Sequence, residues 1–109
     1  MTPKRLNLTY TTGVVLQAIA HGHRYGFDIM DASGLPDGTV YPALRRLEDA
    51  GMLTGRWEDG AKAEAEGRPA RRYYRLTAAG QRMLADALGR FPGLAAAQSG
   101  DETLRPRGV

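Results

Sequence analysis

The sequence contains no cysteine and no long apolar run. Without cysteine the chain forms neither disulfides nor thiolate metal sites, which fits a reducing compartment. Nowhere do about 18 apolar residues follow one another, as a membrane-spanning helix requires. The opening MTPKRLNLTYTT also lacks the apolar core of a signal peptide. We therefore expect a cytoplasmic protein.

The sequence also lacks the motifs that are typical of enzymes. No serine or threonine occurs with a histidine in a nucleophile-elbow motif, and no two carboxylates have the spacing of a catalytic pair. A glycine-rich loop of the phosphate-binding type is also missing. Two histidines, His21 and His23, suggest a metal site, but they lack a clear third ligand, and solvation at a helix end is the favoured alternative. We expect no enzyme activity, no metal and no cofactor.

What remains is a small, mildly basic chain. Its 109 residues suffice for one domain with a single core, and 15 Lys and Arg against 12 Asp and Glu give a net charge of +3. That balance only hints at a polyanionic partner. We expect one domain over residues 1–97 and a disordered tail over residues 98–109, QSGDETLRPRGV, because that segment is polar.

Two helices are predicted near the amino terminus. Apolar residues at helical spacing predict the first over residues 8–19, ended by Gly22. The second fits within residues 25–34, with Phe27 and Met30 facing inward, Ile29 as a further candidate for the inner face, and Gly34 as a left-handed cap. The residues of the first stripe include Leu8, Val15, Leu16 and Ile19.

A third helix is predicted in DGTVYPALRRLEDAG, residues 37–51. It begins at Asp37 or Thr39, since both side chains are good N-caps. Counted from Thr39, Pro42 falls near the third helical position, where its missing N–H breaks no backbone bond. The inward stripe comprises Val40, Leu44, Leu47 and Ala50.

After Gly51 the pattern changes to that of a β-hairpin. The segments MLTGRWE and RRYYRLT, residues 52–58 and 71–77, are rich in strand-forming residues. Trp57 is interpreted as a hairpin anchor, or else as the wall of a ligand pocket near a dimer seam, and at least one of Tyr73 and Tyr74 as core. The linking DGAKAEAEGRPA has nothing apolar to anchor a helical turn, so we expect a mobile loop.

A last helix is predicted from the cap Thr77 to Pro92, which interrupts it. The whole order is helix, helix, tight turn, helix, hairpin and helix. It predicts a winged helix-turn-helix fold, mainly α with a small β-hairpin, whose third helix enters the DNA major groove. The apolar stripe of the last helix comprises Met83, Leu84, Ala87, Leu88 and Phe91.

The outward side of the third helix is the candidate DNA-reading surface. Arginines on it suit guanine edges or phosphates, although RRLED would also fit a solvated face with local ion pairs. The hairpin adds further basic residues that suit the neighbouring backbone or a narrow minor groove. The candidates are Thr39, Tyr41, Pro42, Arg45 and Arg46 on the helix, and Lys62, Arg68, Arg71 and Arg72 on the wing, which is the hairpin with its connecting loop, residues 52–77.

Three runs in this order, RYGFDIM, GLPDGTVYPALRRLEDAGMLTGRWED and GRPARRYYRLTAAG, resemble the PadR-like family of winged-helix transcriptional regulators over about residues 10–90. The resemblance implies a dimeric bacterial repressor of a neighbouring gene, bound to an inverted-repeat operator and released by a small, often aromatic, ligand. It also implies that Tyr25 lies near the phosphate backbone.

Pro92 shortens the last helix, as in the short members of that family, so the dimer surface differs from that of members with a long carboxy-terminal helix. We expect terminal apolar residues to be shared across a two-fold axis, although the same stripe would also pack within one monomer. A winged-helix module that binds an acidic protein partner is the alternative function. The expected interface residues are Leu6, Leu8, Tyr10, Leu84, Leu88 and Phe91.

Overall fold

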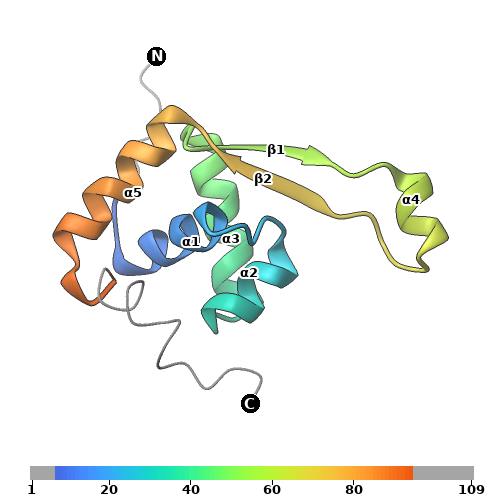
Figure 1. Cartoon of the computed structure of the whole chain (residues 1–109), viewed down its shortest axis with the longest axis horizontal. Helices are drawn as coiled ribbons and strands as arrows, with labels where there is room; N and C mark the ends of the chain where they lie inside the picture. The colour runs from blue at the N-terminus through green and yellow to red at the C-terminus, as the bar shows by residue number, and fades with distance from the viewer. Residues whose placement is uncertain (1–6, 95–109) are drawn as a thin grey trace.

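The computed structural model describes residues 7–94, so Leu6 and the predicted tail lie outside the described residues. Helices surround a small core, and a two-stranded hairpin extends from one side of them (Figure 1). The predicted fold class, mainly α with a small hairpin, is confirmed. In chain order the elements are α1 (Tyr10–Ala20), α2 (Gly26–Ser33), α3 (Asp37–Asp49), β1 (Leu53–Trp57), α4 (Gly60–Ala65), β2 (Arg72–Leu76) and α5 (Ala78–Arg90).

Helix α1 is the centre of the helical body. Thr9 caps it by accepting a hydrogen bond from the Thr12 backbone N–H, so the helix starts after Leu8, not at it. It ends at Ala20, and the left-handed Gly22, at φ 101°, reverses the chain as predicted. Its buried face includes Val15, Leu16 and Ile19, all at most 4% exposed.

Helix α2 ends where the sequence predicted, because Gly34 adopts the left-handed conformation with φ 75°. Its inward residue is the fully buried Ile29, whereas Phe27, predicted to face inward, is 67% exposed. At 100° per residue, positions 27 and 29 point to nearly opposite sides of a helix, so the burial of Ile29 turns Phe27 to the surface. The assignment of Phe27 to the core was wrong.

Helix α3 begins at Asp37, the earlier of the two predicted starts, but Asp37 is its first helical residue and not its cap. Pro36 is its N-cap, without a side-chain cap bond, and the backbone N–H of Val40 already donates to the Pro36 carbonyl at 3.0 Å. Pro42 is therefore the sixth helical residue, not the third, and removes one backbone bond to the Gly38 carbonyl. The helix nevertheless continues through it, because Val40, Leu44 and Leu47 are at most 1% exposed and fix it to the core.

The predicted hairpin is present, with β1 antiparallel to β2 from the pair Leu53–Leu76 to the pair Trp57–Arg72. Tyr74 is the core tyrosine, 8% exposed. The loop before α2 lies along the free edge of β2, where the Tyr74 N–H donates to the Arg24 carbonyl at 2.8 Å. Trp57 is 65% exposed, so its assignment as an anchor was wrong: it stands at the last pair of the hairpin, where most of its side chain is left uncovered.

The hairpin carries α4 at its far end (Figure 1), where a mobile loop without an anchored helix was predicted. Asp59 caps α4 by accepting from the Ala61 backbone N–H at 3.0 Å. Ala63 is only 2% exposed, so a single methyl group supplies the buried contact that the composition did not reveal.

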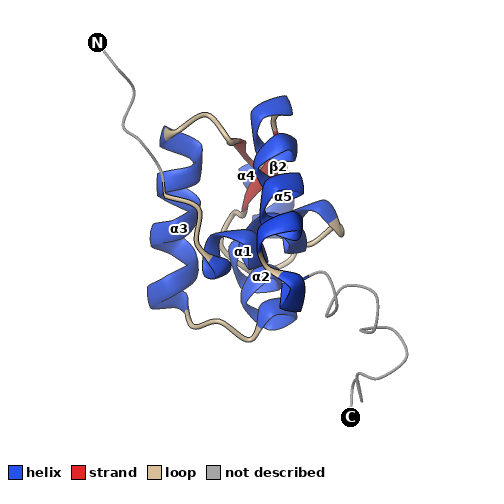
Figure 2. Ribbon diagram, turned by 90° about the vertical axis from the view of Figure 1, so that its left-hand side faces the viewer, coloured by secondary structure: helices blue, strands red, loops and turns tan. Residues whose placement is uncertain are grey.

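Helix α5 returns to pack along α1. Thr77 caps it as predicted, accepting from the Gly80 N–H at 3.0 Å, and it ends at Arg90 before Pro92. Close approach depends on Gly13, where a Cβ would lie 2.9 Å from Leu94 and 3.1 Å from Ala87. Figure 2 shows α3 on one side of the molecule and α5 on the other, with α1 between them.

Within residues 7–94, no helix is both long and apolar enough to cross a membrane.

Candidate nucleic-acid interface

The outer face of α3 carries the predicted reading residues. Tyr41 is 49% exposed, Pro42, Arg45 and Arg46 are exposed, and Thr39 is half-buried. Within the described residues neither arginine forms an ion pair, and the nearby Glu48 pairs with Arg72 of the wing instead. The alternative of local ion pairs along RRLED therefore does not describe α3, and both guanidinium groups are available to a ligand.

Tyr41 is oriented by the first residue of α2. Its ring and hydroxyl lie directly over Gly26, so closely that a Cβ at position 26 would collide with both. One side of the ring is thus covered by α2 backbone while the other remains exposed. Because glycine alone permits this approach, the identity of residue 26 positions a side chain on the outer face of α3.

Arg68, which lies in the segment predicted to be a mobile loop, is instead held within the wing. Its guanidinium bonds both carboxylate oxygens of Glu58 at 2.7 Å and also reaches Glu66. The bond from Arg68 lowers the pKa of the Glu58 carboxyl to about 2, and the same bond raises the pKa of Arg68. With only 18% of its side chain exposed, Arg68 is largely neutralised before any nucleic acid arrives.

Arg71 lies over the ring of Tyr25, 4.1 Å from its centroid, and donates a long hydrogen bond of 3.4 Å to the Tyr73 hydroxyl. The rings of Tyr25 and Tyr73 meet edge to face at 5.5 Å. Tyr25 is half-buried and is the N-cap residue of α2. This cluster joins the start of α2 to the point where the strands pass into the loop that carries α4, which we call the base of the wing.

Arg72 ties the wing to α3. Its Nη2 lies 2.6 Å from a carboxylate oxygen of Glu48, and its guanidinium also faces the ring of Trp57 at 5.5 Å. The Arg72 side chain crosses Gly55, where a Cβ would come within 2.7 Å of its Nε.

Lys62 is exposed on α4 and has no ion pair within the described residues. Three exposed carboxylates lie within four residues of it along the chain: Asp59, Glu64 and Glu66.

Between α2, α3 and the wing lies an open concavity of about 560 Å³. Three of the exposed large apolar side chains, Phe27, Tyr41 and Trp57, line it together with Arg45 and Arg72. Aromatic rings that remain exposed beside cationic side chains are suited to binding a small ligand, or to contacting the sugars and base edges in a DNA groove. The sequence pattern did not predict this meeting of α2 with the wing.

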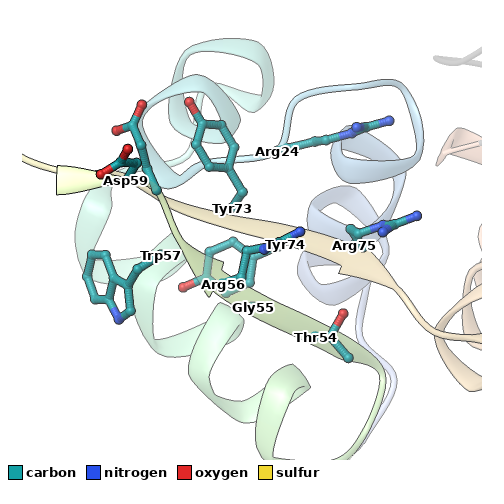
Figure 3. A pocket seen from close by; sticks show the side chains of 10 residues that line it. Arg24, Thr54, Gly55, Arg56, Trp57, Asp59, Tyr73, Tyr74 and Arg75 are labelled. Atoms are coloured by element: carbon teal, nitrogen blue, oxygen red, sulfur yellow. The ribbon is translucent and has the colours of Figure 1, made fainter. Parts of the chain in front are cut away.

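On the other side of the wing lie three residues that the sequence analysis did not single out, Arg24, Arg56 and Arg75. All three are exposed and line an open concavity of about 830 Å³ (Figure 3). The alternation of RYYRL was the available signal, because it places Arg75 on the same strand face as Tyr73.

The expected interface residues Leu8, Leu84, Leu88 and Phe91 are half-buried, and Tyr10 is 48% exposed. The rings of Tyr10 and Phe91 meet edge to face at 5.9 Å, joining the start of α1 to the end of α5.

Of the two histidines, His23 has its Nδ1 3.1 Å from a carboxylate oxygen of Asp28. Within residues 7–94 no group of three or more His, Cys, Asp or Glu side chains is placed to hold a metal ion.

Solved structures with this fold come from several bacteria. A PadR family transcription regulator from hypervirulent Clostridium difficile has a TM-score of 0.66 and 20% identity, over 84% of this chain and 96% of that chain. The protein smu.1704 from Streptococcus mutans has a TM-score of 0.60 and 25% identity, over 97% and 100%. A PadR family transcriptional regulator from Eggerthella lenta has a TM-score of 0.57 and 25% identity, over 85% and 83%.

No curated protein matches the chain significantly. The model of the transcriptional regulator PadR-like family, however, matches residues 15–86, which extend from α1 into α5 and include the hairpin. The predicted resemblance is confirmed, and with it the winged-helix fold of the described residues. The chain belongs to the PadR-like family of transcriptional regulators, whose members bind DNA.

Proposed function

We propose that this chain is a cytoplasmic homodimeric repressor that binds an inverted-repeat operator near the gene it controls and is released by a small aromatic ligand. One observation carries the proposal. The inner edge of α3 is buried to at most 1% exposure at Val40, Leu44 and Leu47, while Arg45 and Arg46 are exposed and unpaired within the described residues. A rigid helix with a free cationic side is what reading a major groove requires.

The roles on α3 follow from side-chain chemistry. Arg45 or Arg46 is suited to the two acceptors of a guanine edge or to a phosphate, because the guanidinium offers paired donors. Thr39 and Pro42 present methyl and methylene groups that suit a thymine methyl. Two copies of α3 related by a two-fold axis would read half-sites about 34 Å apart.

In the wing we assign different roles to the four basic residues that were all expected from the sequence to contact DNA. Lys62 is free to approach a phosphate, and Arg71 and Arg72, half-buried at the base, face the concavity beside α3. Arg68 serves instead to hold the wing closed through Glu58. The duplex is therefore contacted mainly near the base of the wing, beside Tyr25.

The dimer is supported by incompletely buried apolar groups on α1 and α5. Tyr10 and Phe91 form one aromatic pair that spans α1 and α5, and Leu84 and Leu88 lie half-buried on α5. Packing a second copy there would complete their burial. Phe91→Glu should shift the dimer to monomer in sedimentation at micromolar concentration, whereas Arg90→Glu, one residue earlier and exposed, should not. A chain that is monomeric without any substitution would contradict the dimer.

DNA reading is tested by binding isotherms on the operator and on a scrambled duplex. Arg45→Ala should weaken operator binding by about 1 to 3 kcal/mol and relax preference at one base pair. Arg82→Ala, which removes an exposed arginine on α5, is the matched control. Equal affinity of the unchanged chain, Arg45→Ala and Arg82→Ala would rule out reading by α3.

The alternative, docking of the basic loop on an acidic protein, now has less support, because Arg68 in that loop is already paired with Glu58 and Glu66 of this chain. Salt dependence separates the two functions on DNA. A DNA reader loses affinity steeply as salt rises, since every neutralised phosphate releases counterions. The alternative predicts no duplex binding at near-physiological salt.

A further inference from the structure

We propose that Arg24, Arg56 and Arg75 form a binding site for a phosphate-bearing small molecule on the face of the wing turned away from α3. The site does not depend on the proposed DNA-reading residues, and none of its three arginines belongs to them.

The register of the hairpin places these residues together. Thr54 pairs with Arg75 and Arg56 pairs with Tyr73, and directly opposed residues project to the same side of an antiparallel sheet. Arg56 and Arg75 are thus diagonal neighbours on one face. Arg24 joins them at the edge of β2, where its carbonyl accepts from the Tyr74 N–H at 2.8 Å. In Figure 3 the side chains of Arg24 and Arg75 extend in the same direction.

The charges on this face are not compensated. Within residues 7–94, Arg68, Arg72 and Arg90 each form an ion pair, but Arg24, Arg56 and Arg75 form none. Like charges on diagonal neighbours of one sheet face repel each other. A bound anion would convert that repulsion into attraction.

Two carboxylates border the concavity, Glu58 and Asp59, and both are engaged elsewhere. Glu58 accepts two hydrogen bonds from Arg68, and Asp59 accepts from the Ala61 backbone N–H in capping α4. Neither forms an ion pair with the three arginines. The cationic side of the concavity is therefore open to an outside ligand.

The shape favours a small ligand. The concavity of about 830 Å³ falls within the range usual for small-molecule sites, and a second one of about 330 Å³ shares Arg24 and Arg75 with it. Guanidinium groups match phosphate oxygens with paired donors. The hydroxyl group of Thr54 and the amide of Gln81 line the same surface and add donors.

The position argues against the operator as occupant. Leu53 and Tyr74 on the opposite sheet face join the same core as Leu44 and Leu47 of α3. The outer side of α3 and the three arginines consequently lie on different sides of the hairpin. A duplex held by α3 leaves this face uncovered.

Binding is tested by calorimetric titration of the full chain with pyrophosphate at fixed ionic strength. We expect saturable one-to-one binding, at least tenfold weaker in the double variant Arg24→Ala/Arg75→Ala and unchanged in Arg82→Ala. Absence of saturable binding, or equal binding in all three proteins, would overturn the proposal. Equal heats with sodium sulfate at the same ionic strength would do so too, since they would indicate a general anion effect.

A second measurement separates this site from the operator surface. The double variant should bind operator DNA within twofold of the unchanged chain, under conditions where Arg45→Ala binds at least fivefold more weakly. A loss as large as that of Arg45→Ala would identify duplex phosphate as the occupant and overturn the proposal. If the double variant melts at a lower temperature, Arg56→Ala replaces it, with the same expected results.

Discussion

The side chains of Arg68 and Glu58 face each other with two parallel hydrogen bonds, Nη1 to Oε1 and Nη2 to Oε2, each 2.7 Å long. The same carboxylate accepts from the Arg71 backbone N–H at 3.0 Å, and the Glu58 N–H donates to the Arg71 carbonyl at 2.8 Å. These bonds extend the hairpin by one pair beyond Trp57 and Arg72. The wing is therefore closed at its base before α4 begins.

Opening this pair should loosen α4. Arg68→Ala leaves Glu58 without its partner, so limited proteolysis within residues 59–70 should become several-fold faster, while the helical body stays intact. Arg68→Lys should restore only part of the protection, because an ammonium cannot supply the paired donors of a guanidinium. Lys62→Ala, which removes an exposed cation from α4, is the control. Unchanged cleavage of Arg68→Ala would show that α4 is ordered by other contacts.

The same pair predicts how the wing responds to acid. Arg68 lowers the pKa of the Glu58 carboxyl from its ordinary 4.5 to about 2. A lowered folded-state pKa stabilises the native form fully above the unfolded value, and this stabilisation is lost as the pH falls from about 4.5 through about 2. The protection of α4 amides against exchange, relative to the rate of an unfolded chain at the same pH, should thus be constant near neutral pH and decrease only below pH 4.5. Glu58→Gln should remove that acid dependence, and an equal dependence in the variant would contradict the assignment.

Gly26 should control both stability and the outer face of α3. Gly26→Ala puts a Cβ where the Tyr41 ring lies, and such overpacking lowers the free energy of unfolding by about 1 to 3 kcal/mol. Combining it with Tyr41→Ala should recover part of that loss, because the obstruction is gone. Gly89→Ala in α5, where an added Cβ meets nothing within 4 Å, should not destabilise. Strictly additive effects in the double variant would mean that Tyr41 does not occupy this position.

The two sides of α3 should separate stability from binding. Leu47→Ala removes a side chain that is 1% exposed, so urea unfolding should show a loss of about 2 to 5 kcal/mol. Arg46→Ala, on the neighbouring exposed position, should change the free energy of unfolding by less than about 0.5 kcal/mol. Similar losses from both substitutions would mean that the inner and outer edges have been misassigned.

The correct and incorrect expectations have different physical origins. The caps and turns at Thr77, Gly22 and Gly34 were predictable, because they depend on backbone conformation and on neighbours within a few residues. The exposure of the Phe27 and Trp57 side chains was not predictable, because burial of a residue on a short element depends on which neighbouring elements cover it. The anchoring of α4 by Ala63 had no signal either, since one methyl group produces no periodic pattern.

For the candidate interface, too, the sequence predicted local features but not the contacts between residues that are distant along the chain. Helical periodicity sufficed to place Arg45 and Arg46 opposite Leu44 and Leu47. It did not distinguish a free arginine from a paired one, because the partners of Arg68 and Arg72 lie 10 and 24 residues away along the chain. The same limitation concealed the surface formed by Arg24, Arg56 and Arg75.

Local chemistry thus determined the order of the elements, the inner stripe of α3 and membership of the PadR-like family, because spacing, capping and turn preferences act over short stretches of chain. Only the folded chain decided which cations remain available to a ligand. Whether a guanidinium is neutralised depends on carboxylates and rings brought within a few ångströms by the packing of α2, α3 and the wing.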